Sequence, residues 1–147
     1  MAIIANDKFK IKVVPRYTNW WIFDFSFFYD DKPLLNPAIT RDEIFSADEY
    51  ESWGLLPVLE KAINCTENDQ LLRWGAWEDD IEVEIRTHKL DIFDFAVFID
   101  DQYFIDGIQT HGITNPGLKL LVNRDELKKF YLDLKSEMQK VPNAPKV

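Results

Sequence analysis

The sequence has few of the residues from which common catalytic and redox sites are built. Its 147 residues include one cysteine, two histidines and five glycines. Because Cys65 is alone, no intramolecular disulfide can form, and an oxidising compartment is not implied. His88 and His111 have no second histidine or cysteine at the spacing of a zinc site. With no Gly-x-Ser-x-Gly elbow and no glycine-rich phosphate loop, the chain carries no motif of a known catalyst.

Long apolar runs are absent as well. No segment approaches the roughly 18 consecutive apolar residues that a membrane span requires. Residues 1–12 are basic and strand-like and do not have the apolar stretch of a signal peptide. We therefore expect a cytoplasmic protein that does not contact a membrane.

Apolar and aromatic side chains are abundant, at 46% and 14% of the residues. Each buried aromatic side chain removes roughly 150–250 Å² from water, so a chain of this length can fold on a real core. We find no internal repeat and no linker. The sequence predicts one globular domain over residues 1–141, followed by a short flexible tail, residues 142–147, where Pro142 and Pro145 end the preceding helix.

Alternation of apolar and polar residues predicts most of the strands. The expected strands are Phe9–Pro15, Trp20–Tyr29, Ile81–Arg86, Ile92–Ile99, Gln102–Ile108 and Gly117–Val122. Helical spacing of apolar residues from Leu127 to Met138, after a cap at Asn123 and Glu126, predicts a last helix. The expected class is α+β, with a mainly antiparallel sheet of about six strands in the order β-β-α-β-β-β-β-α and helices packed on one face.

Two capping-box patterns predict the other helical region. Thr40 with Glu43, and then Ser46 with Glu49, have the spacing at which a hydroxyl and a carboxylate satisfy the free amides of a helix start. The apolar residues beyond them, which surround Pro57, fit two short helices or one broken helix. Pro57 is expected in the first turn of the second piece.

The net charge of −9 is unevenly distributed along the chain. Residues 1–20 and residues 112–147 each carry +3, whereas residues 21–111 carry −15. Such asymmetry produces a directional field and makes nucleic acid an improbable partner, because phosphate binding depends on clustered Lys and Arg. A basic protein is the expected partner. The plain alternative is that the acidity only keeps the protein soluble.

Residues 71–80 are the segment in which we look first for a partner site. Arg73, Trp74 and Trp77 precede three acids, and exposed Trp and Arg beside acids are residue types that anchor protein interfaces. The alternative is that both tryptophans cover the core beneath a loop. The full set of expected partner-binding residues is Trp74, Trp77, Glu78, Asp79, Asp80, Glu82, Glu84, Asp94, Asp100 and Asp101.

Two other functions stay open on the sequence. Glu82 and Glu84 share one strand face about 7 Å apart, and with Asp94 they could line a divalent-metal site of a hydrolase. A solvated acidic face explains the same pattern, and we assign no metal, cofactor or catalytic residue. The outward face of the second strand, with Trp20, Ile22 and Phe28, could instead join two copies of the chain, so a monomer or a weak homodimer is expected.

We therefore expect a non-catalytic acidic protein that binds and inhibits a basic partner. An acidic surface that meets a basic one gains association rate and specificity from electrostatic steering. Small acidic bacterial immunity proteins, which neutralise basic toxin domains such as nucleases, are similar in size and charge. The likeness extends to size and charge alone.

Overall fold

The structure is a computed structural model, and it describes residues 1–49, 54–76, 81–89, 91–99, 103 and 117–147. In these residues nine strands and two α-helices are assigned. The strands are β1 (Ala2–Ala5), β2 (Phe9–Tyr17), β3 (Trp21–Tyr29), β4 (Lys32–Pro33), β5 (Phe45–Asp48), β6 (Leu71–Gly75), β7 (Ile81–Thr87), β8 (Ile92–Ile99) and β9 (Gly117–Asn123). The helices are α1 (Leu55–Asn64) and α2 (Arg124–Lys140), and a 3-10 turn lies at Arg41–Glu43.

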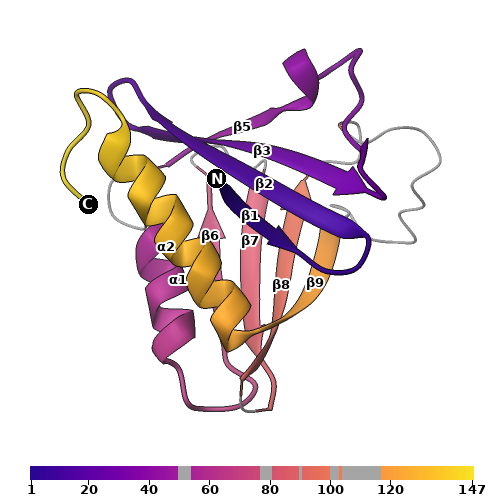
Figure 1. The fold of residues 1–147 in the computed structure, drawn as a ribbon, viewed down its shortest axis with the longest axis vertical. Helices are drawn as coiled ribbons and strands as arrows, with labels where there is room; N and C mark the ends of the chain where they lie inside the picture. The colour runs from indigo at the N-terminus through magenta and orange to yellow at the C-terminus, as the bar shows by residue number, and fades with distance from the viewer. Residues whose placement is uncertain (50–53, 77–80, 90, 100–102, 104–116) are drawn as a thin grey trace.

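The strands form two antiparallel sheets. The N-terminal sheet contains β1 to β5, in the order β1-β2-β3-β4, with β5 also paired to β3. The C-terminal sheet contains β6 to β9 in sequence order. Both helices lie against one face of the C-terminal sheet, and the N-terminal sheet crosses the upper end of that sheet (Figure 1). The expected α+β class is therefore confirmed, with more strands than predicted and two sheets in place of one.

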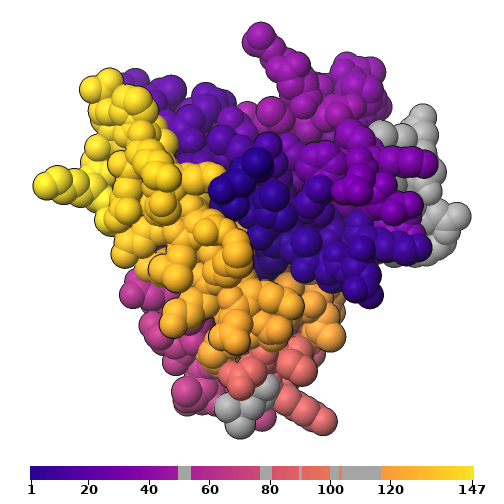
Figure 2. Space-filling model, in the orientation of Figure 1, coloured from indigo at the N-terminus to yellow at the C-terminus, as the bar shows by residue number. Residues whose placement is uncertain are grey.

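One apolar core joins the two sheets and the helices. Trp74 of β6 lies against Phe23 and Phe25 of β3, with ring centroids 5.8 and 6.1 Å apart. Phe95 of β8 meets Phe130 of α2 edge to face at 5.7 Å. Figure 2 shows α2 and the N-terminal strands covering the side of the molecule that faces the viewer. This layered packing leaves the opposite face of the C-terminal sheet without a covering layer from the described elements.

The two predicted capping boxes are wrong. Ser46 lies in β5, where Phe45 and Ala47 point into the core and Ser46 points outward. The Thr40 hydroxyl donates to the carbonyl oxygen of Asn36 at 2.7 Å and does not cap a helix. The sequence from residue 40 to residue 48 therefore satisfies its polar groups through a turn and a strand, and the burial of Phe45 outweighs the local helix signal.

The helix of this region is one continuous element, α1, and Pro57 lies in its first turn as predicted. Its N-terminus is capped by a residue from outside the helix, because Glu49 Oε1 accepts a hydrogen bond from the Leu55 amide at 2.5 Å. The predicted box of Ser46 and Glu49 therefore contained a carboxylate that does cap a helix. That helix is α1, which begins at Leu55 and not directly after Ser46. The cap of α2 is as predicted, with Asn123 and Glu126 exchanging hydrogen bonds.

Four strands were not predicted: β1, β4, β5 and β6. The expected strand Gln102–Ile108 lies outside the described residues, apart from Tyr103. In the predicted C-terminal tail, Ala144 packs against the core next to Val141. No helix of the described segments is long and apolar enough to cross a bilayer.

Candidate protein-binding face

The C-terminal sheet has one buried face and one outward face. In β7, Ile81, Val83 and Ile85 are buried, and the intervening residues point away from the helices. We call the second face the outer face. It carries the side chains of Leu71, Arg73, Glu82, Glu84, Arg86, Ile92, Asp94, Ala96, Phe98, Lys119 and Leu121. No described element covers it, and Leu121 and Ile92 stay 58% and 38% exposed.

Two of the predicted acids on this face share one cation. Arg73 of β6 is directly opposite Glu84 of β7 in the sheet. Its Nε lies 3.0 Å from a Glu84 carboxylate oxygen and 3.2 Å from one of Glu82. Glu82 and Glu84 do share a strand face, as the alternation predicts, and the single charge of Arg73 balances one of their two negative charges.

The third predicted acid, Asp94 of β8, is buried and also paired. His88 Nε2 lies 2.5 Å from Asp94 Oδ2, and Lys119 Nζ lies 3.1 Å from the same oxygen. A carboxylate with so little contact with water is stabilised by hydrogen-bonding and charged partners of this kind. Sequence reasoning missed both pairings. Lys119 reaches Asp94 through the register between β8 and β9, and His88 lies directly after β7, where the chain turns back into β8.

The described surface as a whole is close to electrical balance. The described residues contain 19 Asp and Glu side chains against all 17 Lys and Arg. The other seven acids belong to residues 50–53, 77–80, 100–102 and 104–116, which contain no Lys or Arg. Of the predicted partner-binding residues, Trp77, Glu78, Asp79, Asp80, Asp100 and Asp101 lie outside the described residues.

Trp74 does not belong to an exposed site. Its side chain is 1% exposed and packs in the core between the two sheets. Its prediction as a partner-binding residue is therefore corrected, because a side chain at this depth reaches no partner without unfolding of the core. The alternative, that both tryptophans cover the core beneath a loop, agrees with the burial of Trp74, although Trp74 lies in strand β6 and Trp77 lies outside the described residues.

One row of paired residues marks the upper end of the C-terminal sheet. Gly75 pairs with Glu82, Glu82 pairs with Phe98, and Phe98 pairs with Gly117. The chain leaves the sheet just beyond this row after β6 and after β8, and it returns at the start of β7 and of β9. The β6–β7 connection and the β8–β9 connection contain acids but no Lys or Arg. Both connections therefore begin and end at this end of the sheet.

Glu49 lies beside the same end of the sheet, next to the start of α1. Burial raises the pKa of its carboxyl above the ordinary value of 4.5, and the hydrogen bond from the Leu55 amide opposes part of that rise. The Trp74 indole also favours the ionised form of Glu49. Its N–H makes no hydrogen bond of normal geometry, so we take Leu55 as the principal partner of the carboxylate.

The described residues contain no group of three or more His, Cys, Asp or Glu side chains that could hold a metal ion. Glu82, Glu84 and Asp94 each have a cationic partner within 3.2 Å. Nothing in their arrangement favours the metal-dependent hydrolase.

The fold and its outer face define the protein as an α+β domain with an open, charged sheet surface. No protein-family model, no curated protein and no solved structure matches the chain. Its role is therefore argued from its own residues.

Proposed function

We propose that this chain is a non-catalytic binding domain that inhibits a basic protein partner, in the manner of an immunity protein that neutralises a toxin domain. The observation that carries the proposal is the outer face of the C-terminal sheet. It combines paired strands, ion pairs and exposed apolar side chains such as Leu121, and none of the described elements covers it. Charged and apolar groups on one rigid surface are the usual components of a specific interface.

The charge of the chain supports a basic partner. The described surface is nearly balanced, so most of the net charge of −9 belongs to the acid-rich connections whose flanking residues meet at the Gly75–Gly117 end of the sheet. A negative potential concentrated toward one end would orient a basic partner as it approaches. The rigid outer face would then supply the specific contacts.

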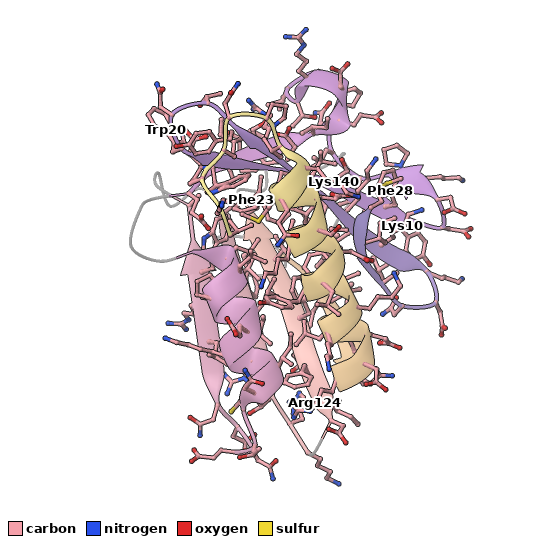
Figure 3. The ribbon with its side chains drawn as sticks, turned by 60° about the vertical axis from the view of Figure 1, so that its left-hand side comes forward. Lys10, Trp20, Phe23, Phe28, Arg124 and Lys140 are labelled. Carbon is pink, nitrogen blue, oxygen red and sulfur yellow. The ribbon has the colours of Figure 1, made fainter. Side chains whose placement is uncertain are left out.

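The alternative function, in which two copies of the chain pair through the outward face of β3, has less support than binding of a basic partner. Of the three residues proposed for it, Ile22 is buried, and Phe28 is partly covered by the Lys10 ammonium, which lies 5.0 Å from its ring centre. Figure 3 shows Lys10 and Phe28 together, with Trp20 at the other end of the sheet. The polar network of Arg16, Asp24 and Ser46 lies on the same face of the sheet, so no continuous apolar patch forms there.

Neutralisation in cells tests the proposal. Basic toxin domains, beginning with any encoded next to the gene of this chain, are expressed with and without the chain, and growth is measured. We expect the chain to restore growth against one such toxin. We expect the variant Asp100→Lys/Asp101→Lys to protect less, because it removes negative charge where the partner approaches.

The matched control is Glu60→Lys/Glu67→Lys, which makes the same change of charge at exposed acids in α1 and just after it. This control variant should protect as well as the unmodified chain. Protection against no basic toxin, or equal protection by both double variants, would contradict the proposal.

A further inference from the structure

A small pocket opens on the outer face of the C-terminal sheet. Its walls are Leu71, Glu84, Arg86, Asp94, Ala96, Phe98 and Lys119, contributed by all four strands of the sheet. Because every wall residue belongs to a paired strand, the shape of the pocket is set by the sheet itself. A site built on strands is held more rigidly than one built on loops.

The two acids in the pocket wall already have cationic partners. Glu84 accepts from Arg73 Nε at 3.0 Å, and Asp94 binds both His88 and Lys119. The pocket therefore has little remaining capacity to attract a second cation.

Arg86 is the cation of this pocket to which the described part of the chain offers no such partner. Its position in β7 is opposite Asp94 of β8 and Leu71 of β6. Among the residues that the structure describes, none forms an ion pair or a hydrogen bond with its guanidinium. The Asp94 carboxylate, which would be its natural cross-strand partner, is instead bound by His88 and Lys119. A guanidinium has five donors in a planar fork that matches a carboxylate in a bidentate pair.

The rest of the wall is apolar. Leu71, Ala96 and Phe98 line it, and the Phe98 ring lies close to Gly117 on the neighbouring strand. A Cβ atom at residue 117 would come within 2.5 Å of Phe98 Cδ1. The glycine therefore leaves room for the ring on the neighbouring strand, as glycine does for aromatic side chains in sheets.

We propose that this pocket binds a single carboxylate carried on a short aliphatic chain, which in a complex is a Glu side chain of the partner protein. Arg86 takes the carboxylate, and Leu71, Ala96 and Phe98 receive the methylene groups. A monoanion suits the pocket better than a phosphate dianion, because Glu84 and Asp94 would repel the second negative charge. The assignment of the carboxylate to a partner protein rests on the proposed function. The ability of the pocket to bind a carboxylate does not depend on that function.

The test uses the full chain and a blocked amino acid, N-acetylglutamate α-amide, as the probe. Titration is followed by NMR through the Arg86 Nε–H signal and the amide signals of Ala96 and Phe98. We expect saturable shifts of these signals at millimolar probe. N-acetylglutamine α-amide, which has the same shape without the charge, should bind at least about tenfold more weakly. Inorganic phosphate should also bind more weakly than the glutamate probe.

The variant Arg86→Gln, followed through the amide signals of Ala96 and Phe98, should bind the glutamate probe about tenfold or more weakly. The matched control Arg41→Gln changes an arginine in the 3-10 turn, whose side chain is 96% exposed, and should respond as the unmodified chain does. Equal response to the glutamate and glutamine probes, tighter binding of phosphate, or an unchanged response in Arg86→Gln would overturn the inference. Because this titration needs no partner, its failure leaves the growth assay of the proposed function unaffected.

Discussion

Folding raises the pKa of Glu49, because its carboxyl is partly removed from water beside the first turn of α1. Between the ordinary value of 4.5 and the raised value, the folded protein retains a proton that the unfolded chain has lost. The contribution of Glu49 to stability is therefore complete below pH 4.5 and is lost as the pH rises through the raised pKa.

The first prediction concerns this residue. Glu49→Gln keeps an oxygen acceptor for the Leu55 amide but cannot ionise, so the free energy of unfolding should fall less with rising pH than in the unmodified chain. Urea unfolding at about pH 4 and about pH 7 measures this difference. Glu60→Gln, at an exposed carboxyl of α1, should leave the pH dependence as it is. Parallel stability–pH curves for the Glu49→Gln variant and the unmodified chain would show that Glu49 does not titrate as described.

Arg124 holds three elements together at the lower end of the molecule. Its guanidinium donates to the carbonyl oxygens of Ile63 and Cys65 at the end of α1, and its Nε lies 2.7 Å from Asp91. It also lies over the ring of Phe93, 4.9 Å from the ring centre. Figure 3 shows Arg124 at the start of α2, near the end of α1. The residue therefore satisfies carbonyl groups that the last turn of α1 leaves free.

We predict that Arg124→Met lowers the free energy of unfolding by about 2–3 kcal/mol, since charged hydrogen bonds are lost and two partly buried carbonyl oxygens are left without this donor. Chemical denaturation measures the loss. Lys128→Met, at an exposed position one turn further along α2, should change stability by less than about 0.5 kcal/mol. A loss no larger for Arg124→Met than for Lys128→Met would contradict this role.

At the scale of elements, the upper row of the C-terminal sheet depends on Gly117. Besides the Phe98 ring, a Cβ at this residue would meet the Val97 carbonyl oxygen at 2.7 Å. A backbone oxygen in a paired strand has little freedom to move. The contact between β8 and β9 at this row therefore requires a residue without a side chain.

We predict that Gly117→Ala destabilises the fold by about 1–3 kcal/mol, the usual cost of overpacking. The same variant should displace Phe98 and weaken binding of the glutamate probe. Thermal unfolding and the NMR titration measure the two effects separately. Leu121→Ala, at a 58% exposed position of the same strand, serves as the control and should be nearly neutral. A Gly117→Ala protein as stable as the control would mean that β9 can shift to make room.

The elements that could be predicted from sequence are those with strong periodic patterns. β2, β3, β7, β8 and β9 alternate, and α2 combines helical spacing with a local cap, so each is visible in its own residues. β5 was mistaken for helix because Ser46 and Glu49 fit a capping box by chance of spacing. β6, with the sequence Leu-Leu-Arg-Trp-Gly, has no clear alternation and becomes a strand by pairing with β7.

The site was predictable only within single strands. Alternation placed Glu82 and Glu84 on one face, which is confirmed. Their pairing with Arg73, and that of Asp94 with Lys119, depends on strand neighbours and register, which a single strand does not encode. The sequence analysis named Arg73 but not its pairing with these acids, and the outer face was expected to be more acidic than it is.

At the scale of the whole molecule, the central claim is the proposal that long-range attraction brings a basic partner to the Gly75–Gly117 end of the C-terminal sheet. The direct measurement is the association rate of the chain with a basic toxin domain against which it restores growth, over about 0.05 to 0.5 M salt. We predict a fall of about tenfold or more, with a smaller fall for Asp100→Lys/Asp101→Lys than for Glu60→Lys/Glu67→Lys. An association rate that is independent of salt, and equal in the two variants, would contradict the account.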